Sequence, residues 1–457
     1  MTTLDFVRML INERGRPVKV GLYGLGKGNT ALLYRLIEEK NCKVSVRSDN
    51  ECALPIQGIP AYFGERAKDI YEDLLILSPS ARRDAPHILR AIERGTIVSS
   101  ECDIFFMKRV GTRFAVSGSD GKSSTVTLSA LMLEGAFPKV FTIGNIGVPY
   151  SVPPQGDEYG YVCELSSFNL EYIKPDVERC LITNISENHI NWHGSFENYI
   201  KAKLNLTENA REVVLPADDD ILSRAMAGRR LFAVYSANEG IERLKTKFEA
   251  EHYVYIRDGY LTVDGEPLIS ADSLALKTEY AIKNALGSVA LTLGYAKSEA
   301  VLSALCSFKG LAHRCQLCYT GGGIDCFDSS IDTSPARTVS TLNSLGREVN
   351  IILGGQGKQL SLTPLVEPLR KYARSIAVYG EMRDEFFSLI ENDEALRLKP
   401  HEYFPTFRDA VVYLLERAER GESILLSPGC ASYGEFCDFE ARGDAFSRIV
   451  KDYFEKE

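Results

Sequence analysis

Residues 118–124 have the types and spacing that most clearly suit chemistry. They follow the apolar run RFAVS, precede the periodic run VTLSALML, and read Gly118, Ser119, Asp120, Gly121, Lys122, Ser123 and Ser124. Backbone N–H groups of such a loop can surround phosphate oxygens, and the N-terminus of the next helix adds a favourable dipole. Lys122 can reach terminal phosphates and the Ser123 hydroxyl can bind Mg²⁺, so this strand–loop–helix segment predicts nucleotide binding.

A second glycine-rich loop follows another apolar run near the N-terminus. It reads Gly24, Leu25, Gly26, Lys27, Gly28 and Asn29. As a dinucleotide-binding fingerprint this loop is weak, because Asn29 occupies the last small position. An NAD-dependent oxidoreductase is the alternative that it raises, and that alternative leaves the loop at 118–124 unexplained.

The elements that must position these loops alternate between short β-rich runs and helical stretches, which is typical of parallel α/β sheets. We expect three sets of strands, at 19–23, 43–47 and 74–77, then at 113–116, 161–163, 180–183, 213–215 and 232–235, and finally at 349–353, 375–379 and 423–426. Within residues 252–268, the Asp-Gly pairs at 258–259 and 264–265 flank an alternating apolar run and predict antiparallel hairpins. The chain is therefore expected to form three α/β domains, at 1–107, 108–310 and 311–457.

Composition excludes several classes of protein. The net charge of -9 provides no general attraction to nucleic acid or to an anionic membrane. The N-terminus has no signal-peptide pattern, and no apolar run reaches the roughly 18 to 20 residues of a membrane span. The 11 cysteines show no paired framework, and the pair Cys315 and Cys318 lies in a strand-like stretch, which favours a structural role. We expect a soluble cytoplasmic protein.

An ordered series of motifs resembles the Mur ligase family over nearly the whole chain. Besides the loop at 118–124, the series contains ELSSF at 164–168, NISENH at 184–189, AK at 202–203, HR at 313–314, GGQGK at 354–358, LSPGCAS at 426–432 and FEARGDAF at 439–446. The last motif is similar to that of the glutamate-adding members. The resemblance implies a Rossmann-like N-terminal domain, a central P-loop ATPase-like domain and a Rossmann-like C-terminal domain.

The activity that the resemblance implies is ATP-dependent amide formation in peptidoglycan precursor synthesis. D-Glutamate would be joined to UDP-N-acetylmuramoyl-L-alanine through an acyl phosphate, with release of ADP and phosphate. Both reactants of the first step are anions, so metal ions and lysines must shield their repulsion. ATP and Mg²⁺ are thus the expected cofactors, the two small molecules are the expected partners, and a monomer is expected.

The resemblance also implies roles for residues in the central and C-terminal regions. The catalytic positions are Lys122, His189, Lys203 and Arg314, and the metal positions are Ser123, Glu164, His189 and Lys203. Lys203 matches a lysine that is carbamylated in the family, which converts a cation into an anion. Asn284 and Arg314 join residues 118–124 as ATP contacts, and the guanidinium fork of Arg314 suits the γ-phosphate.

Two further sets of positions follow from the resemblance. The UDP-substrate is expected to contact Gly24, Leu25, Gly26, Lys27, Ser48, Asp49, Asn145 and Ser166. Glutamate is expected at Thr333, Lys358, Ser432 and Phe439. One lysine with several hydroxyl and backbone donors suits a ligand that carries two carboxylates.

The chain departs from the family pattern near the expected ATP contacts. It has DSSIDTS at 328–334 where many relatives have Asn-Asp-Ser-Lys-Ala-Thr-Asn, so Ser329 replaces an acid expected near the ribose and Ile331 replaces a lysine. The pair Tyr280 and Ala281 replaces a His-Asn pair. These changes bear on ribose contacts and leave the phosphate loop in place.

The segment NHIN at 188–191 replaces Asp-His-x-Asp. It keeps the histidine and loses both acids, at Asn188 and Asn191, which bears on support of the metal. Two alternatives stay open within the class: another amino-acid ligase of the Mur or folylpolyglutamate type, and a homologue that binds a UDP-sugar without turnover.

Overall fold

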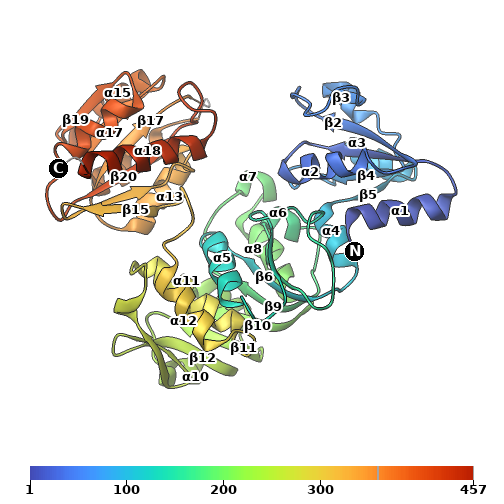
Figure 1. The fold of residues 1–457 in the computed structure, drawn as a ribbon, viewed down its shortest axis with the longest axis horizontal. Helices are drawn as coiled ribbons and strands as arrows, with labels where there is room; N and C mark the ends of the chain where they lie inside the picture. Colours follow the sequence, from blue (N-terminus) through green and yellow to red (C-terminus); the bar gives the residue numbers. More distant parts are fainter. Residues whose placement is uncertain (358–359, 456–457) are drawn as a thin grey trace. The chain divides into compact units, whose positions relative to one another are not determined.

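The computed structural model describes residues 1–357 and 360–455. The chain divides into two compact units, Met1–Ser307 and Phe308–Glu457. The described residues contain three sheets, two in the first unit and one in the second (Figure 1). The predicted α/β class and the three sets of strands are confirmed. The division into three domains at 107/108 and 310/311 stays a prediction.

The first sheet is parallel, in the order β3-β2-β1-β4-β5. Its strands are β1 (Val18–Tyr23), β2 (Cys42–Ser48), β3 (Ala61–Phe63), β4 (Leu74–Leu77) and β5 (Ile97–Ser99). The accompanying helices are α1 (Thr3–Arg14), α2 (Lys27–Leu36), α3 (Pro86–Glu93) and α4 (Glu101–Met107). The strand order reverses between β1 and β4, which is where ligands bind in open α/β sheets.

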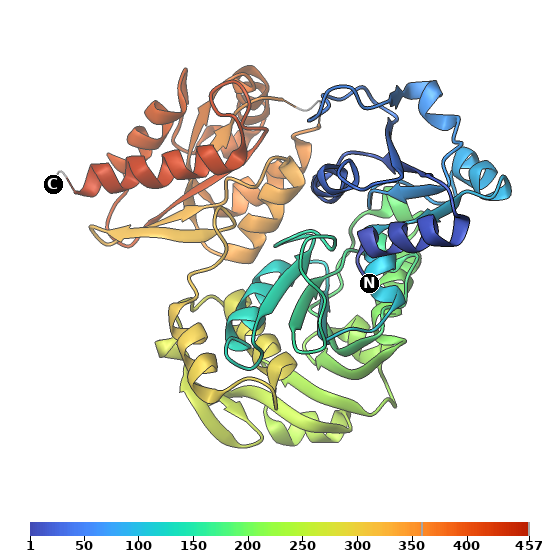
Figure 2. The same ribbon diagram turned by 45° about the vertical axis from the view of Figure 1, so that its right-hand side comes forward.

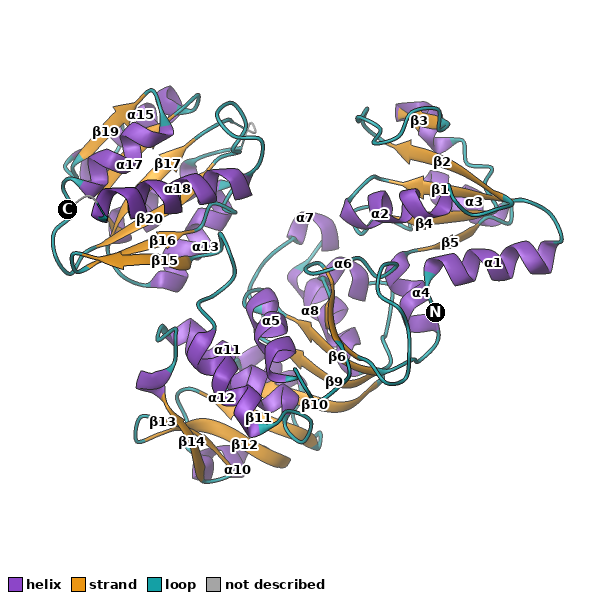
Figure 3. Cartoon of the chain, viewed as in Figure 1, coloured by secondary structure: helices purple, strands orange, loops and turns teal. Residues whose placement is uncertain are grey.

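The second sheet follows the order β14-β13-β12-β11-β10-β9-β6-β8-β7. Its strands are β6 (Thr112–Ser117), β7 (Val140–Gly144), β8 (Gly160–Glu164), β9 (Val177–Ile182), β10 (Ala210–Pro216), β11 (Leu231–Ser236), β12 (Ala250–Arg257), β13 (Tyr260–Val263) and β14 (Glu266–Ser270). Its helices are α5 (Lys122–Met132), α6 (Ser167–Leu170), α7 (Ile190–His193), α8 (Phe196–Leu204), α9 (Asp220–Ala225), α10 (Ile241–Lys247), α11 (Glu279–Thr292) and α12 (Ser298–Ser307). Figure 3 shows helices flanking this sheet.

The predicted hairpins are the antiparallel end of the second sheet. β12 pairs with β13, and β13 pairs with β14. Asp258 and Asp264 have φ of 51°, and the glycine after each also has positive φ. Asp-Gly suits such turns because glycine and aspartate tolerate the left-handed region. β14 forms one edge of the sheet.

The third sheet, in the second unit, follows the order β15-β16-β20-β17-β18-β19; it is coloured from orange to red in Figure 2. Its strands are β15 (Gln316–Gly321), β16 (Ile324–Asp328), β17 (Val349–Gly354), β18 (Ala373–Tyr379), β19 (His401–Phe404) and β20 (Ser423–Gly429). Its helices are α13 (Pro335–Leu345), α14 (Val366–Tyr372), α15 (Arg383–Glu391), α16 (Glu394–Arg397), α17 (Phe407–Leu415) and α18 (Phe439–Phe454). Only β15 runs antiparallel to its neighbour, and it contains Cys318 of the Cys315–Cys318 pair.

Several inner strands of the three sheets are buried along their whole length. All residues of β4, β8, β17 and β20 are buried, as expected for parallel strands covered on both faces. Among the helices of residues 1–357 and 360–455, none combines the length and apolar character needed to cross a bilayer.

Candidate active site

Three neighbouring strand ends bring together the polar segments of the second sheet. Val116 of β6 pairs with Glu164 of β8 and with Leu181 of β9. The carboxyl ends of these parallel strands therefore meet at one edge of the sheet. The loop at 118–124 follows β6, Glu164 ends β8, and Thr183 follows β9.

Close packing explains why two positions of the loop at 118–124 are glycine. Gly118 has φ of 146°, and a Cβ there would lie 1.9 Å from Thr183 Oγ1. Gly121 has φ of 79°, and a Cβ there would lie 2.5 Å from Asn284 Oδ1. The sequence-predicted Asn284, on α11, therefore lies against this loop. It also accepts a hydrogen bond from Thr125 at 3.3 Å.

Two lysine side chains converge on a single carbonyl oxygen of the loop. Lys122 Nζ donates to the Gly118 carbonyl at 2.9 Å and to the Ser119 carbonyl at 2.8 Å. Lys203 Nζ, from α8, donates to the same Gly118 oxygen at 2.6 Å. Two amines at one glycine-containing loop, beside the N-terminus of α5, create a site suited to a polyanion.

Lys203 is the more deeply buried of these two lysines, with 2% of the residue exposed. Burial lowers the pKa of its amine well below the usual value, and the Lys122 ammonium lowers it further. Asp120 and Glu164 oppose this shift through their negative charges. Burial therefore shifts the protonation equilibrium of this amine towards its neutral, nucleophilic form.

Glu164 has an oxygen atom that lacks a hydrogen-bond partner among the described residues. The residue is 3% exposed, and its Oε2 atom is buried without a hydrogen bond. A buried carboxylate without a partner is costly, which makes it a good candidate ligand for a cation. Ser123, at the start of α5, is also buried.

The residues at these strand ends fit a metal that is also held by phosphate oxygens. Within the described ranges, no group of three or more His, Cys, Asp or Glu side chains is arranged to hold a metal ion. Mg²⁺ characteristically uses one or two carboxylates together with substrate phosphates. The unpartnered Glu164 oxygen beside the phosphate-type loop agrees with that donor set.

His189 lies at the start of α7 in a strained backbone conformation. Its φ is 53°, in the left-handed region that side chains other than glycine rarely adopt. The ring centroid of His189 is 4.9 Å from that of Phe168 and 6.5 Å from that of Tyr199. Asn188 Oδ1 accepts a hydrogen bond from the His189 N–H at 2.9 Å. Asn188 and Asn191 are exposed.

The first sheet places the predicted UDP-substrate loop at the carboxyl ends of β1 and β2. Gly24 has φ of 81°, and a Cβ there would lie 2.4 Å from Ser78 Oγ, so the loop after β4 packs directly against it. Leu25 follows, Gly26 caps α2 and Lys27 begins that helix. Ser48 ends β2, and the next residue, Asp49, accepts a hydrogen bond from Tyr23 at 2.6 Å.

The remaining two UDP-substrate positions lie in the second sheet. Asn145 follows β7 and its N–H donates to the Glu164 carbonyl at 3.3 Å. Ser166 caps α6 and forms a reciprocal capping pair with Asn169. Both positions are therefore close to Glu164: Ser166 is two residues further along the chain, and Asn145 is joined to Glu164 by a backbone hydrogen bond.

In the second unit, buried polar contacts join the predicted glutamate-site segments. Arg442 is fully buried and donates to Ser330 and to the Cys430 carbonyl. Ser330 Oγ donates in turn to the carbonyl of Phe439 at 2.8 Å. The segments that contain Thr333, Ser432 and Phe439 are thereby tied together. Lys358 lies outside the described residues.

Arg314 and the altered segment at 328–334 lie at the start of the same unit. Arg314 N–H donates to the Leu311 carbonyl at 3.2 Å. Ser329 is buried and accepts a hydrogen bond from the Cys315 N–H at 3.1 Å, while Ile331 N–H donates to the His313 carbonyl at 3.1 Å. The residues that replace the expected acid and lysine thus hold this segment against residues 313–315.

Known proteins of one family are similar to this chain in sequence and in fold. Residues 116–292 match the Mur ligase middle domain. The chain is 27% identical to UDP-N-acetylmuramoylalanine–D-glutamate ligase of Clostridium beijerinckii over 95% of this chain and 96% of the relative. It is 29% identical to the ligase of the same name from Clostridium novyi, over 95% of this chain and 97% of the relative.

The chain is similar to D-glutamate-adding Mur ligases over nearly its whole length, and residues 116–292 match the Mur ligase middle domain. Its fold is also that of the UDP-N-acetylmuramate-alanine ligase from Thermotoga maritima, with a TM-score of 0.58, 19% identity, and coverage of 96% of this chain and 99% of the other. The MurF ligase from Thermotoga maritima in complex with ADP aligns with a TM-score of 0.50 and 15% identity, over 96% of each chain.

Sequence motifs did not reveal the structural roles of two residues that support the glycine-rich loops. Tyr199 OH lies 2.8 Å from Ser119 Oγ and is buried, so it links α8 to the phosphate loop. Asn29, which weakened the dinucleotide fingerprint, is buried and donates to the Gly24 carbonyl at 2.7 Å. Its amide holds the loop in place, whereas a glycine would provide only close packing. The motif departure is therefore a structural replacement.

Proposed function

We propose that this protein adds D-glutamate to UDP-N-acetylmuramoyl-L-alanine in an ATP-dependent step of peptidoglycan precursor synthesis, yielding ADP and phosphate. The observation that carries the proposal is the convergence of Lys122 and Lys203 on the Gly118 carbonyl beside the unpartnered Glu164 oxygen. The substrate pair is taken from the D-glutamate ligases that align with nearly the whole chain.

The proposed reaction has two steps. A carboxylate oxygen of the UDP-substrate attacks the γ-phosphorus of ATP, and the bond from that phosphorus to the bridging oxygen breaks, releasing ADP. The amine of D-glutamate then attacks the resulting acyl phosphate, loses a proton and expels phosphate. The chain's contribution is to bind and orient two anions and to neutralise their repulsion.

Residues of the phosphate loop supply most of that contribution. Backbone N–H groups at 118–124 and the Lys122 amine bind the ATP phosphates, and Asn284 contacts the nucleotide. Lys122 currently donates to two loop carbonyls, so phosphate oxygens would replace these acceptors. We also assign Arg314 to ATP, by its family position and its planar donor fork.

Mg²⁺ would be held by Ser123, Glu164, His189 and a carbamylated Lys203. When bound, it shields the phosphate charge and orients the transferring group. The low pKa of the buried Lys203 amine supports carbamylation, because only the neutral amine captures carbon dioxide. The carbamate would replace a buried amine with an anion beside the metal.

The two remaining substrates are assigned to the segments already described. The UDP-substrate would contact Gly24, Leu25, Gly26, Lys27, Ser48, Asp49, Asn145 and Ser166, and D-glutamate would contact Thr333, Lys358, Ser432 and Phe439. We propose that the three sheets correspond to domains 1–107, 108–310 and 311–457, which bind UDP-substrate, ATP and amino acid respectively. The enzyme is proposed to act as a cytoplasmic monomer.

Phosphate release from ATP, measured with UDP-N-acetylmuramoyl-L-alanine and a panel of amino acids, tests this function. D-Glutamate should support turnover far better than L-glutamate, lysine, diaminopimelate or L-alanine, and the ligated product should appear by mass spectrometry. Reactions without the UDP-substrate provide the background. Equal turnover with a cationic amino acid contradicts the assignment, and UDP-substrate binding without any turnover identifies a non-catalytic homologue.

A further inference from the structure

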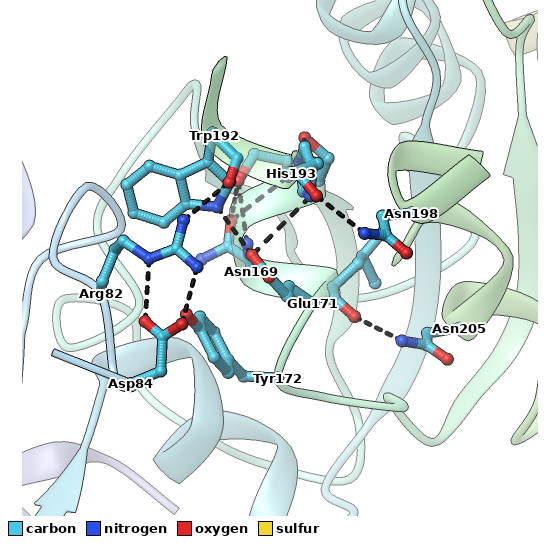
Figure 4. A network of polar contacts seen from close by, with 12 residues as sticks. Arg82, Asp84, Asn169, Glu171, Tyr172, Trp192, His193, Asn198 and Asn205 are labelled. Carbon is cyan, nitrogen blue, oxygen red and sulfur yellow. Dashed lines mark hydrogen bonds and ion pairs between the residues drawn. The ribbon is translucent and has the colours of Figure 1, made fainter. Parts of the chain in front are cut away.

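A polar and aromatic cluster joins the loop after β4 to α7 (Figure 4). Arg82, in that loop, donates from Nη1 to the backbone carbonyl of Trp192 at 2.7 Å. Its guanidinium carbon also lies 5.1 Å from the Trp192 ring centroid. Asp84 accepts from Arg82 Nε at 2.8 Å and from Nη2 at 2.7 Å, which orients the guanidinium so that Nη1 is directed to the carbonyl.

Trp192 is also connected, through Phe168, to His189, which is one of the proposed metal residues. Trp192 Nε1 donates to Glu171 Oε2 at 2.7 Å. The Phe168 ring lies between, with its centroid 4.7 Å from that of Trp192 and 4.9 Å from that of His189. Trp192 and His189 thus both pack against Phe168, and they lie within α7 and at its N-cap, respectively.

The conformation of this segment needs outside support. α7 has four residues, far fewer than an isolated helix needs to be stable in water. Its N-cap is His189, whose φ of 53° is unfavourable for a side chain with a Cβ. Such a conformation persists only when surrounding contacts hold it. Arg82 provides the contact to a backbone carbonyl, and Glu171 provides the contact to the indole.

The loop that carries Arg82 packs against the proposed UDP-substrate loop that follows β1. Ser78, at its start, packs against Gly24 of the loop after β1. These two loops follow β4 and β1, the strands between which the order of the first sheet reverses. A ligand bound at this position therefore contacts the loop that holds Trp192.

We propose that Arg82 and Trp192 are a positioning pair that fixes α7, and with it the His189 backbone, to the loop after β4. Binding of the UDP-substrate diphosphate at that loop is thereby transmitted to His189 at the phosphate and metal site. The inference rests on the proposed function, because it uses the assigned sites of the UDP-substrate and of His189. Neither Arg82 nor Trp192 was found among the family motifs.

Trp192 is the only tryptophan in the chain, so its emission reports on this contact directly. UDP and UDP-N-acetylmuramoyl-L-alanine, each added without ATP, should produce a saturable change in tryptophan emission of the wild-type enzyme. In Arg82→Ala this change should be lost, while calorimetry still shows binding of the UDP-substrate. Wild-type enzyme that binds the UDP-substrate without any change in emission would overturn the inference, as would the absence of such binding.

Ligation as a function of Mg²⁺ concentration provides the second readout. Arg82→Ala should raise the Mg²⁺ concentration at half-maximal rate by about tenfold or more, as expected when support of a metal residue is removed, with a smaller change in the KM of the UDP-substrate. Arg94→Ala is the matched control: Arg94, at the C-terminal end of α3, is exposed, and its guanidinium carbon lies 5.1 Å from the Tyr71 ring centroid. It should leave both readouts unchanged.

Two further variants apply if Arg82→Ala does not fold. Arg82→Lys keeps the charge and one donor but loses the planar fork to Asp84, and Trp192→Phe keeps an aromatic ring but loses the donor to Glu171. Both should raise the Mg²⁺ requirement. Wild-type Mg²⁺ dependence in folded variants would refute the positioning role. Failure of the wild-type enzyme to release phosphate with D-glutamate would instead refute the proposed function. The two failures can be distinguished because the tryptophan emission experiment is done without ATP and needs no turnover.

Discussion

Replacement of Lys203 by methionine should affect stability and activity in opposite directions. The Lys203 amine is 2% exposed and has a pKa well below its usual value because of burial. Methionine has a similar length and removes the polar group. The Gly118 carbonyl keeps a hydrogen bond from Lys122 Nζ at 2.9 Å, so the substitution leaves no buried acceptor without a partner.

The magnitude follows from two opposing contributions. Loss of one hydrogen bond costs about 0.5–1.5 kcal/mol. Removal of a buried polar group that water solvates in the unfolded chain returns about 1–3 kcal/mol on the scale of protein substitutions. We expect Lys203→Met to raise the free energy of unfolding by about 1 kcal/mol at pH 7, and to raise the melting temperature of the Met1–Ser307 unit by about 1–2 °C.

The sign of the pH dependence follows from the lowered pKa. In the unfolded chain Lys203 stays protonated up to about pH 10.4. Below its native pKa the wild type carries the full cost of a buried charge, and this cost decreases as the pH rises from the native pKa toward the unfolded value. The advantage of Lys203→Met should therefore be larger at pH 6.5 than at pH 9.5.

Thermal melting in buffer free of carbon dioxide, together with ligation assays in bicarbonate, tests both effects. Lys203→Met should lose ligation by about a hundredfold or more while still binding the UDP-substrate. Carbon-13 NMR with labelled bicarbonate should show a carbamate signal in the wild type that the variant lacks. Lys201→Met, an exposed position on the same helix, is the control. A less stable Lys203→Met enzyme that still ligates would refute the reasoning.

Three other predictions concern separate parts of the chain. Lys122→Ala should fold normally and lower kcat by about a hundredfold or more, since it removes charge stabilisation of the transferring phosphate; a folded variant with near-wild-type ligation would exclude Lys122 as the phosphate lysine. His313 has its pKa raised by a hydrogen bond to Asp328 Oδ2 at 2.7 Å, so this pair stabilises the second unit at low pH and the effect is lost as the pH rises through the native pKa. His313→Gln should therefore lower the melting temperature more at pH 5.5 than at pH 8.5, and an equal loss at both pH values would contradict this. Gly443→Ala would place a Cβ 2.1 Å from His313 Nδ1 and should destabilise the same unit by about 1–3 kcal/mol in denaturant unfolding, whereas a neutral effect would show that the pair can move aside.

Sequence reasoning found the parts of the site that depend on neighbouring residues. The phosphate loop lies between a strand and a helix that local patterns predict, and Glu164 ends a buried strand, so both could be located without coordinates. The hairpins followed from Asp-Gly turns. The short strands β3, β5, β7, β16 and β19 were not predicted, because a run of three to five residues carries little periodicity unless, as in β4, all of its residues are strongly apolar.

The supporting contacts depend on residues that are distant in sequence and could not be predicted in this way. Tyr199 is 80 positions from Ser119, and Arg82 is 110 positions from Trp192. No local spacing relates such pairs. Asn29 is a different case. The sequence shows that Asn29 departs from the dinucleotide-binding motif, but only the structure shows that its amide donates a hydrogen bond to the Gly24 carbonyl and so holds the loop.

The edge strand β14 has a consequence for self-association. The second sheet ends at β14, which contains Pro267. Proline has no N–H to donate, and Glu266 beside it places an exposed charge on the same short strand. A strand from another molecule would find an interrupted row of donors and an acidic side chain. This border therefore disfavours edge-to-edge aggregation of a sheet whose parallel strands form slowly during folding, which protects newly synthesised chains at high concentration.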